Sequence, residues 1–174
     1  MLCVNKINDY SFTLVVQMNI ILDTSTFSLS DIFLTDKKQN ILIHGYFTKM
    51  IYSNQYISLS CIYYNLPLSS YHIVTSANDT YVHYDPFDLQ NNQVIQELSE
   101  IEYRILEHYK NYYCLTANIS NSIKKRLQCG KIKLFCSDDT KITPTTKIII
   151  KISGIWETTH EIGLAIKFFP ANKR

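Results

Sequence analysis

The chain has 174 residues, 46% of them hydrophobic, which favours one globular domain with its own core over a disordered segment. The net charge of +2 is far from the strongly basic balance of a typical nucleic-acid-binding module, so an acidic partner would need a local patch. The start lacks the apolar run of a signal peptide, no stretch is long enough to cross a membrane, and the five cysteines include no C-x-x-C pair. We therefore expect an intracellular protein with reduced thiols and no membrane contact.

The first half of the chain is typical of β-structure, because short stretches of alternating apolar and polar residues are separated by turn residues. Two of these stretches flank Ser53-Asn54-Gln55 and predict a hairpin, in which Asn54 is expected to take the positive φ of a tight turn. The strands predicted in this half cover residues 11–22, 41–52, 56–64, 70–76 and 80–84.

The apolar period then changes from two to about 3.6, which predicts an amphipathic helix over residues 89–113 with Asp88 or Asn91 as its N-cap. Its apolar stripe contains Val94, Leu98, Ile101, Ile105 and Tyr109 or Tyr112. The polar positions are mostly acidic (Glu97, Glu100, Glu102, Glu107), so this side of the helix should not meet a polyanion. A second, short helix is predicted before Gly130, which stands where a left-handed C′ residue is favoured.

Three further strands are predicted near the end of the chain, at 131–136, 147–156 and 162–169, the last two as a closing hairpin. The order is therefore many strands, a helical insert at about 88–129, and three more strands. This order predicts a mainly β fold with an inserted long α-helix in a single domain, residues 1–174. An OB-like β-barrel fits it best, and a β-sandwich is the alternative.

The late strands place lysines on one parity and bulky apolar residues on the other. Ile148, Ile150, Ile152, Gly154 and Trp156 share one face, so by parity alone Trp156 is expected in the core. The opposite faces carry Phe135 and Phe169 beside five lysines: Lys131, Lys133, Lys147, Lys151 and Lys167.

This lysine-bearing face has two explanations. In the first explanation the face is simply exposed to solvent, because sheet exteriors need charge and lysine discourages edge-to-edge pairing. In the other case it is a groove in which lysines follow phosphates and aromatic rings stack on bases. The early hairpin offers further rings for stacking beside Lys49: Tyr46, Phe47, Tyr52, Tyr56, Tyr63 and Tyr64.

Catalytic and metal-binding motifs are missing from the sequence. The four glycines are scattered, so they form no phosphate loop, and no histidine or cysteine pairs have zinc-site spacing. No nucleophile motif is recognisable either. We therefore expect a protein that is not an enzyme and needs no metal or other cofactor.

Two stretches resemble a known family. Residues 45–68, "GYFTKMIYSNQYISLSCIYYNLPL", and 147–169, "KIIIKISGIWETTHEIGLAIKFF", are similar to the two best-kept blocks of the single-stranded DNA-binding proteins of large eukaryotic DNA viruses and related mobile elements. The resemblance spans most of residues 41–169, and its motif positions are Phe47, Lys49, Ile51, Tyr52, Lys151, Gly154, Trp156, Glu157, Gly163 and Lys167. It implies an OB-type fold distantly similar to phage replication proteins that bind single strands.

The resemblance also implies a function: sequence-tolerant binding of single-stranded DNA in viral or virus-derived replication and recombination. Replication proteins and further copies of the chain are the other partners it suggests. Phage-type relatives end in an acidic tail, whereas this chain ends "FFPANKR", so recruitment through a tail is in doubt. The residues expected to bind DNA are Tyr46, Phe47, Lys49, Tyr52, Tyr63, Tyr64, Lys131, Lys133, Lys151, Trp156 and Lys167.

A second hypothesis is a structural or protein-interaction β-module, such as a minor capsid or adaptor component, in which the tyrosines form a protein interface. Stacking on bases requires rings interleaved with lysines, whereas a protein interface predicts a lysine-free apolar patch. The sequence does not decide between the host nucleus and a cytoplasmic site of viral replication, because the basic run Lys124-Lys125-Arg126 is too short.

Overall fold

The computed structural model describes residues 20–40, 43–76, 79–136 and 142–171. Within them the fold is mainly β with one long helix, as the sequence predicts. The strands are β1 Ile32–Leu34, β2 Lys38–Asn40, β3 Gly45–Ser53, β4 Ser58–Leu59, β5 Ile62–Leu66, β6 His72–Thr75, β7 Thr80–His83, β8 Asn118–Ile119, β9 Lys131–Leu134, β10 Ile148–Glu157 and β11 Glu161–Pro170. The helices are α1 Leu89–Tyr112 and α2 Ser122–Gln128, with 3₁₀ turns at Thr24–Thr26 and Leu29–Asp31.

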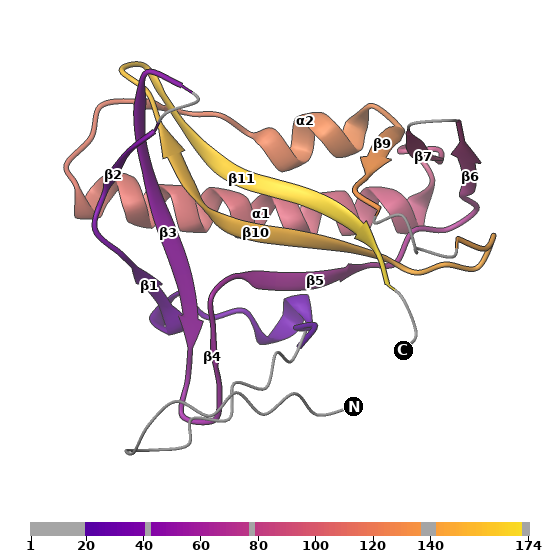
Figure 1. Ribbon diagram of the computed structural model, residues 1–174, viewed down its shortest axis with the longest axis horizontal. Coiled ribbons are helices and arrows are strands. Elements are labelled where there is room, and N and C mark those ends of the chain that lie inside the picture. The colour runs from indigo at the N-terminus through magenta and orange to yellow at the C-terminus, as the bar shows by residue number, and fades with distance from the viewer. Residues whose placement is uncertain (1–19, 41–42, 77–78, 137–141, 172–174) are drawn as a thin grey trace, which may run out of the picture.

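The strands form one mixed sheet in the order β1-β3-β10-β11-β9-β7-β6 (Figure 1). Most neighbours are antiparallel, and β8 and β9 run parallel to β11. The sheet stays open, because β1 and β6 end the order and do not pair with each other. The predicted closed barrel is therefore not confirmed, and the described strands do not divide into the two packed sheets of a β-sandwich.

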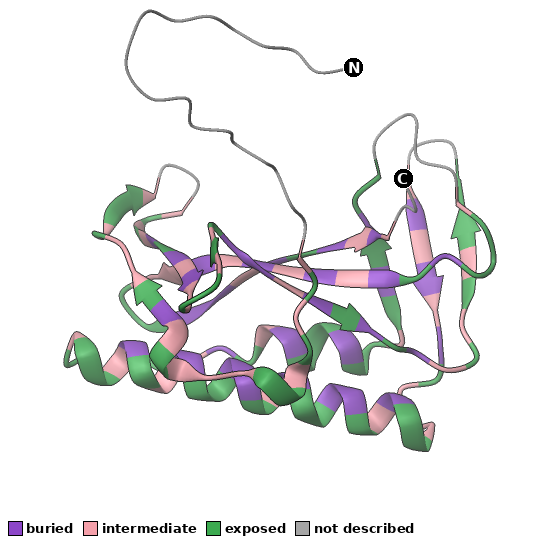
Figure 2. Ribbon diagram, turned by 90° about the horizontal axis from the view of Figure 1, so that it is seen from below, coloured by how far each residue is buried: buried purple, intermediate pink, exposed green. Residues whose placement is uncertain are grey.

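Both helices cover the same face of the sheet (Figure 2). The core lies between the helices and the sheet. Buried residues of α1 and α2 form one side of it, and every second residue of β3, β5, β9 and β10 packs against them from the sheet. The other face, which we call the open face, carries no helix and is turned toward the viewer in Figure 1. The two helices lie between β7 and β9 in the chain, so the predicted helical insert also contains β8.

Helix α1 forms where its apolar stripe predicts. Val94, Leu98, Ile101, Ile105 and Tyr109 are all buried, and they pack against the sheet. Its N-cap is Asp88, whose carboxylate accepts hydrogen bonds from the backbone N–H groups of residues 90 and 91 at 3.0 and 3.2 Å. Tyr112 is exposed, so the stripe ends at Tyr109.

Glu102 was assigned to the polar side of α1, and this assignment is wrong, because its side chain is fully buried. Its two carboxylate oxygens accept the N–H of Ile123 at 3.0 and 2.9 Å, and one of them also accepts the N–H of Lys124 at 3.4 Å. The carboxylate therefore satisfies the first N–H groups of α2, which would otherwise be buried without a partner. At the other end of α2, Gly130 takes the expected positive φ of 65°.

The predicted hairpin around Asn54 forms, but differently in detail. Asn54 does not take a positive φ; its side-chain oxygen accepts the N–H of Tyr56 and of Ile57 at 2.9 and 3.1 Å, which closes the turn. The returning strand pairs with β3 only over β4 and then breaks. Its continuation, β5, pairs with β10, so β10 meets β5 along Ile148–Ile152 and β3 along Gly154–Glu157.

The closing hairpin β10–β11 also forms as predicted, with one irregularity. A β-bulge between Ile152 and Gly154 shifts the register and reverses the alternation beyond it. Ile155 is consequently fully buried, and Trp156 lies on the open face. The prediction that Trp156 shares the core face with Ile152 is wrong for this reason.

The predicted strand at 11–22 lies outside the described residues except for its last three, of which Leu22 makes a parallel bridge to Tyr64. In the described part of the chain, Cys61, Cys114, Cys129 and Cys136 are free thiols. No helix described there is both long and apolar enough to span a membrane.

The buried carboxylate of Glu102 makes a prediction about stability and pH. Burial raises its pKa, so the folded chain binds this proton more tightly than the unfolded chain does. Glu102 therefore contributes most to stability at low pH, and the contribution falls as the pH rises from about 4.3 through the raised folded value. Urea denaturation at a series of pH values should show the free energy of unfolding of the wild type falling relative to Glu102→Gln over this range.

The matched control is Glu100→Gln, an exposed carboxylate on the same helix, which should show no such trend. The raised pKa of Glu102 would be contradicted if the free energy of unfolding of the wild type, relative to that of Glu102→Gln, stayed constant or increased with pH.

Candidate nucleic-acid interface

The open face is built from the outward positions of neighbouring strands. Strand β3 contributes Phe47 and Lys49, and β5 contributes Tyr63. Beyond them, β10 contributes Lys151 and, after the bulge, Trp156. Strand β11 adds Lys167 and Phe169, and β9 adds Lys131, Lys133 and the adjacent Phe135.

Four of these residues form a row across the sheet. Lys151 of β10 stands directly opposite Lys167 of β11 on one side and Tyr63 of β5 on the other. Leu134 of β9 pairs with Phe168, so Lys133, one residue earlier, falls in line with Lys167. The row therefore crosses β5, β10, β11 and β9, with lysines on three strands. We call Lys151, Lys167 and Lys133 the lysine row.

Like charges directly opposite each other on a sheet are destabilising, unlike opposite charges or apolar pairs. The five-residue segments that carry the row (62–66, 131–135, 148–152 and 166–170) contain no aspartate or glutamate. In the part of the chain that the structure describes, neither Lys151 nor Lys167 has an ion-pair partner. The pair Lys151–Lys167 thus concentrates positive charge at a place where no described carboxylate compensates it.

Aromatic rings lie beneath the ammonium groups of this face. The Nζ of Lys151 lies 5.6 Å from the centre of the Tyr63 ring, and that of Lys167 lies 4.8 Å from Phe135. Lys131 lies 4.3 Å from the ring of Tyr81. Such cation–π contacts hold each ammonium group over the sheet without neutralising it. The rings and lysines of the open face are therefore interleaved, not segregated.

Lys133 is the lysine of the row whose charge is compensated. Its Nζ lies 2.5 Å from a carboxylate oxygen of Asp79, and this hydrogen bond raises the pKa of Lys133 and lowers that of Asp79. Both side chains are substantially exposed, so an anionic ligand would compete with a solvent-screened ion pair.

At the β10–β11 turn end of the open face, two aromatic rings lie on glycines. A Cβ added to Gly154 would stand 2.6 Å from the Cζ of Phe47, and one added to Gly163 would stand 2.6 Å from the Cε2 of Trp156. Each ring therefore occupies the space that a side chain would take. The indole Nε1–H of Trp156 also donates to the carbonyl of Leu164 at 3.3 Å, which fixes the ring in this position.

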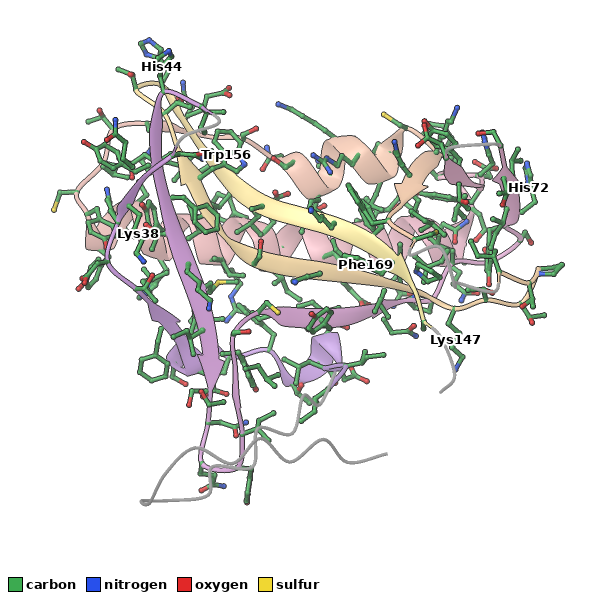
Figure 3. The ribbon with its side chains drawn as sticks, in the orientation of Figure 1. Lys38, His44, His72, Lys147, Trp156 and Phe169 are labelled. Carbon is green, nitrogen blue, oxygen red and sulfur yellow. The ribbon has the colours of Figure 1, made fainter. Side chains whose placement is uncertain are left out.

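Phe47 and Trp156 border a hollow of about 690 Å³, which Ala165, Ile43 and the β2 residues Lys38 and Asn40 also line. We call it the aromatic hollow. Figure 3 labels Lys38 and Trp156 in this part of the sheet. Lys38 was not among the residues predicted from the sequence, because β2 is short and has no apolar pattern. Pairing of Lys38 with Phe47 brings it to the hollow.

Three of the predicted stacking residues do not reach the open face. Tyr52 is buried, with its hydroxyl donating to Asp31 at 3.2 Å, and Tyr64 is fully buried in the core. Both share the parity of the core residues of their strands, so the stacking prediction is wrong for them. Tyr46 is exposed but shares the parity of buried Thr48, and it pairs with Glu157 on the helix side of the sheet.

The motif residue Glu157 has a structural role in the fold. Its carboxylate pairs with Lys37 at 2.6 Å and accepts the hydroxyl of Tyr109 at 2.7 Å. The same Tyr109 hydroxyl lies 3.0 Å from the hydroxyl of buried Thr48. These bonds join the end of α1 to β3 and β10 behind the aromatic hollow, so they hold its two strands in place.

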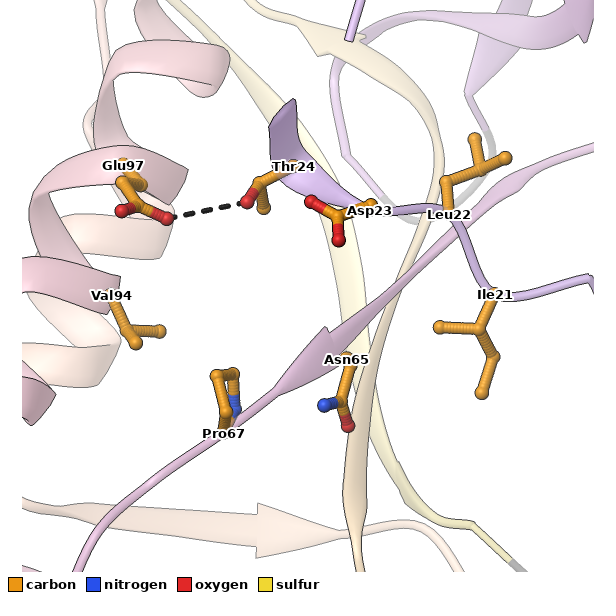
Figure 4. Close-up of a pocket in the computed structure, with 8 residues that line it drawn as sticks. All are labelled: Ile21, Leu22, Asp23, Thr24, Asn65, Pro67, Val94 and Glu97. Atoms are coloured by element: carbon orange, nitrogen blue, oxygen red, sulfur yellow. Dashed lines mark hydrogen bonds between the residues drawn. The ribbon is translucent and has the colours of Figure 1, made fainter. Parts of the chain in front are cut away.

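A second, smaller cavity of about 260 Å³ lies between β5, α1 and the first described residues (Figure 4). Asp23 and Glu97 line it, and Glu97 accepts the hydroxyl of Thr24 at 3.2 Å. Its carboxylates make it unsuitable for a polyanion. Among the described residues no group of three or more potential metal ligands occurs.

Comparison with protein-family models, with curated proteins and with solved structures gives no match. The likeness to a family of single-stranded DNA-binding proteins therefore depends on the two sequence blocks alone.

The contact between Trp156 and Gly163 can be tested directly, because Trp156 is the only tryptophan. In Gly163→Ala the new methyl group would collide with the indole ring, which must then leave the sheet surface. We expect the tryptophan emission to shift to longer wavelength as the ring enters water, and a loss of about 1–3 kcal/mol in the free energy of unfolding. Unchanged emission with unchanged stability would mean that the ring does not lie on Gly163.

Proposed function

We propose that this chain is a non-catalytic single-stranded DNA-binding protein whose open face holds the strand. Lys151 and Lys167 would meet backbone phosphates, together with Lys49, Lys131 and Lys133. Tyr63, Phe47 and Trp156 would offer ring faces to bases. The proposal includes the processes that the sequence resemblance implies, which are viral or virus-derived DNA replication and recombination.

The single observation that carries the proposal is the direct pairing of Lys151 with Lys167, neither of which has an ion-pair partner among the described residues. A solvated sheet exterior gains nothing from this arrangement, because opposite charges at these positions would be more stable. A phosphate bridging the two ammonium groups would turn the repulsion into attraction. Each neutralised phosphate also releases counterions, which favours binding most at low salt.

Charge on the helix side is mixed. The exposed carboxylates Glu97 and Glu100 of α1 would repel a phosphate backbone there. The helices also expose cations, Arg104 on α1 and Lys124, Lys125 and Arg126 on α2. The choice of the open face therefore rests on its paired lysines and not on a difference in overall charge between the faces.

The alternative, a protein-interaction module, predicts an apolar patch without lysines. The aromatic hollow is the surface that most nearly fits this description, yet Lys38 lines it and Lys49 lies two residues from Phe47 on the same side of β3. The interleaving of rings and ammonium groups at Tyr63, Phe135 and Tyr81 likewise favours a polynucleotide.

We also propose that the open sheet corresponds to the OB-type barrel of the family that the sequence resembles. Strand β3 supports this comparison, because its first half pairs with β10 and its second half pairs with β1 and β4. A strand shared in this way bends the sheet, as in a partly open barrel.

Fluorescence anisotropy with a labelled oligo-dT tests the proposal. The wild-type protein should bind at micromolar concentration or below in low salt, and more weakly as salt rises. The double variant Lys151→Gln/Lys167→Gln should bind more weakly and reduce the slope of log K against log salt by about 1.4, since each lysine contributes about 0.7 on a single strand. Its free energy of unfolding should stay within about 1 kcal/mol of the wild type, because both side chains point outward.

The matched control is Lys124→Gln/Lys125→Gln, which removes the same charge from exposed positions of α2 on the helix side. It should leave affinity and salt slope nearly unchanged. No binding of oligo-dT by the wild type in low salt would refute the proposed function. Equal losses in both double variants would mean that only the total charge matters and that the open face is not the site.

A further inference from the structure

We propose that the aromatic hollow is a nucleotide subsite in which one base of the bound strand stacks on the aromatic rings that line it, with the phosphate of that nucleotide at Lys38. This inference rests on the proposed function and adds to it a defined position at which a base, and not only the backbone, is held. The remainder of the bound strand would follow the lysine row.

The walls of the hollow suit a planar aromatic ligand. Phe47 lies against Gly154 and Trp156 against Gly163, so both rings rest on the sheet where a Cβ would displace them. Trp156 is further fixed by its hydrogen bond to the carbonyl of Leu164. Rings that are already held in place lose little side-chain freedom on binding, and stacking on them contributes about 1–3 kcal/mol for each base.

The size and charge of the hollow favour a nucleotide over an apolar side chain. A volume of about 690 Å³ is within the usual range of about 300–1,000 Å³ for small-molecule sites. No carboxylate lines it, and the exposed Lys38 stands at its β2 side with no ion-pair partner among the residues that the structure describes. Lys49 extends the positive charge toward the lysine row along the same face of β3.

The hollow and the lysine row lie on one continuous surface. Trp156 and Lys151 both belong to β10, five residues apart, which corresponds to about 15 Å along a strand. A single strand of DNA can therefore place a base in the hollow and phosphates at the row at the same time. The two contacts differ in chemistry, since only the hollow requires a base.

That difference allows the subsite to be tested apart from the row. Oligo-dT and an abasic strand of the same length should both bind the wild-type protein by anisotropy, the abasic strand more weakly. Only oligo-dT should quench the fluorescence of Trp156, the sole tryptophan. Phe47→Leu should weaken the binding of oligo-dT about tenfold and leave the affinity for the abasic strand unchanged.

The matched control is Phe87→Leu, an exposed phenylalanine just before α1, which should bind both strands as the wild type does. If oligo-dT binds but leaves Trp156 emission unchanged, and Phe47→Leu binds it normally, the subsite is refuted and the proposed function stands. Quenching by a phenylalanine-containing peptide under those conditions would assign the hollow to a protein side chain. If neither strand binds, the proposed function fails and the subsite with it.

Discussion

The β-bulge between Ile152 and Gly154 determines which side chains reach the open face. Before it, Lys151 points outward and Ile152 inward; after it, the alternation reverses, so Ile155 enters the core and Trp156 leaves it. One inserted residue thus lets a single strand present a lysine at one end and an indole at the other on the same surface. Without the bulge, the indole would compete with α1 for the core, and the aromatic hollow would lose one wall.

The two faces of the sheet divide the tasks of the molecule. On the helix side, apolar residues of α1 fill the core, and the carboxylates there are hydrogen-bonded, as in the bonds of Glu102 with α2 and of Glu157 with Lys37 and Tyr109. Among the described residues, the hydroxyl of Tyr64 is the buried side-chain group without a hydrogen-bond partner. On the open face, Lys151 and Lys167 lie over aromatic rings, and neither has a carboxylate partner in the described part of the chain. Polar groups that are satisfied internally support a fold, whereas uncompensated ones are available to a ligand.

The sequence was sufficient wherever periodicity alone decides the structure. The stripe from Val94 to Tyr109 predicted α1, and the alternation of lysine and isoleucine predicted the closing hairpin and its outward lysines. Tyr64 could have been assigned to the core, because it stands two residues from Ile62 and Leu66 on one strand. The turn from Ser53 to Ile57 was predicted correctly in position but not in conformation, because Asn54 closes it through its side chain instead of a positive φ.

Other features depend on contacts that a linear pattern does not contain. Glu102 looks like a surface carboxylate until α2 is placed above it, and Lys38 has no distinguishing neighbours until β2 pairs with β3. The bulge had a local indication, since glycine inside a strand often marks one and Ile155, next to Gly154, was an apolar residue on the polar parity, as was Ile149. The ion pair between Lys133 and Asp79 could not be predicted either, because it forms only where β7 pairs with β9.

Lysine footprinting tests the central claim, that the open face holds a polyanion, most directly. The protein is acetylated briefly with and without saturating oligo-dT, and the modification of each lysine is read by mass spectrometry. The account predicts several-fold protection of Lys49, Lys151 and Lys167, with Lys124 and Lys125 on the helix side modified as before. Protection of the α2 lysines in place of those on β10 and β11 would contradict it.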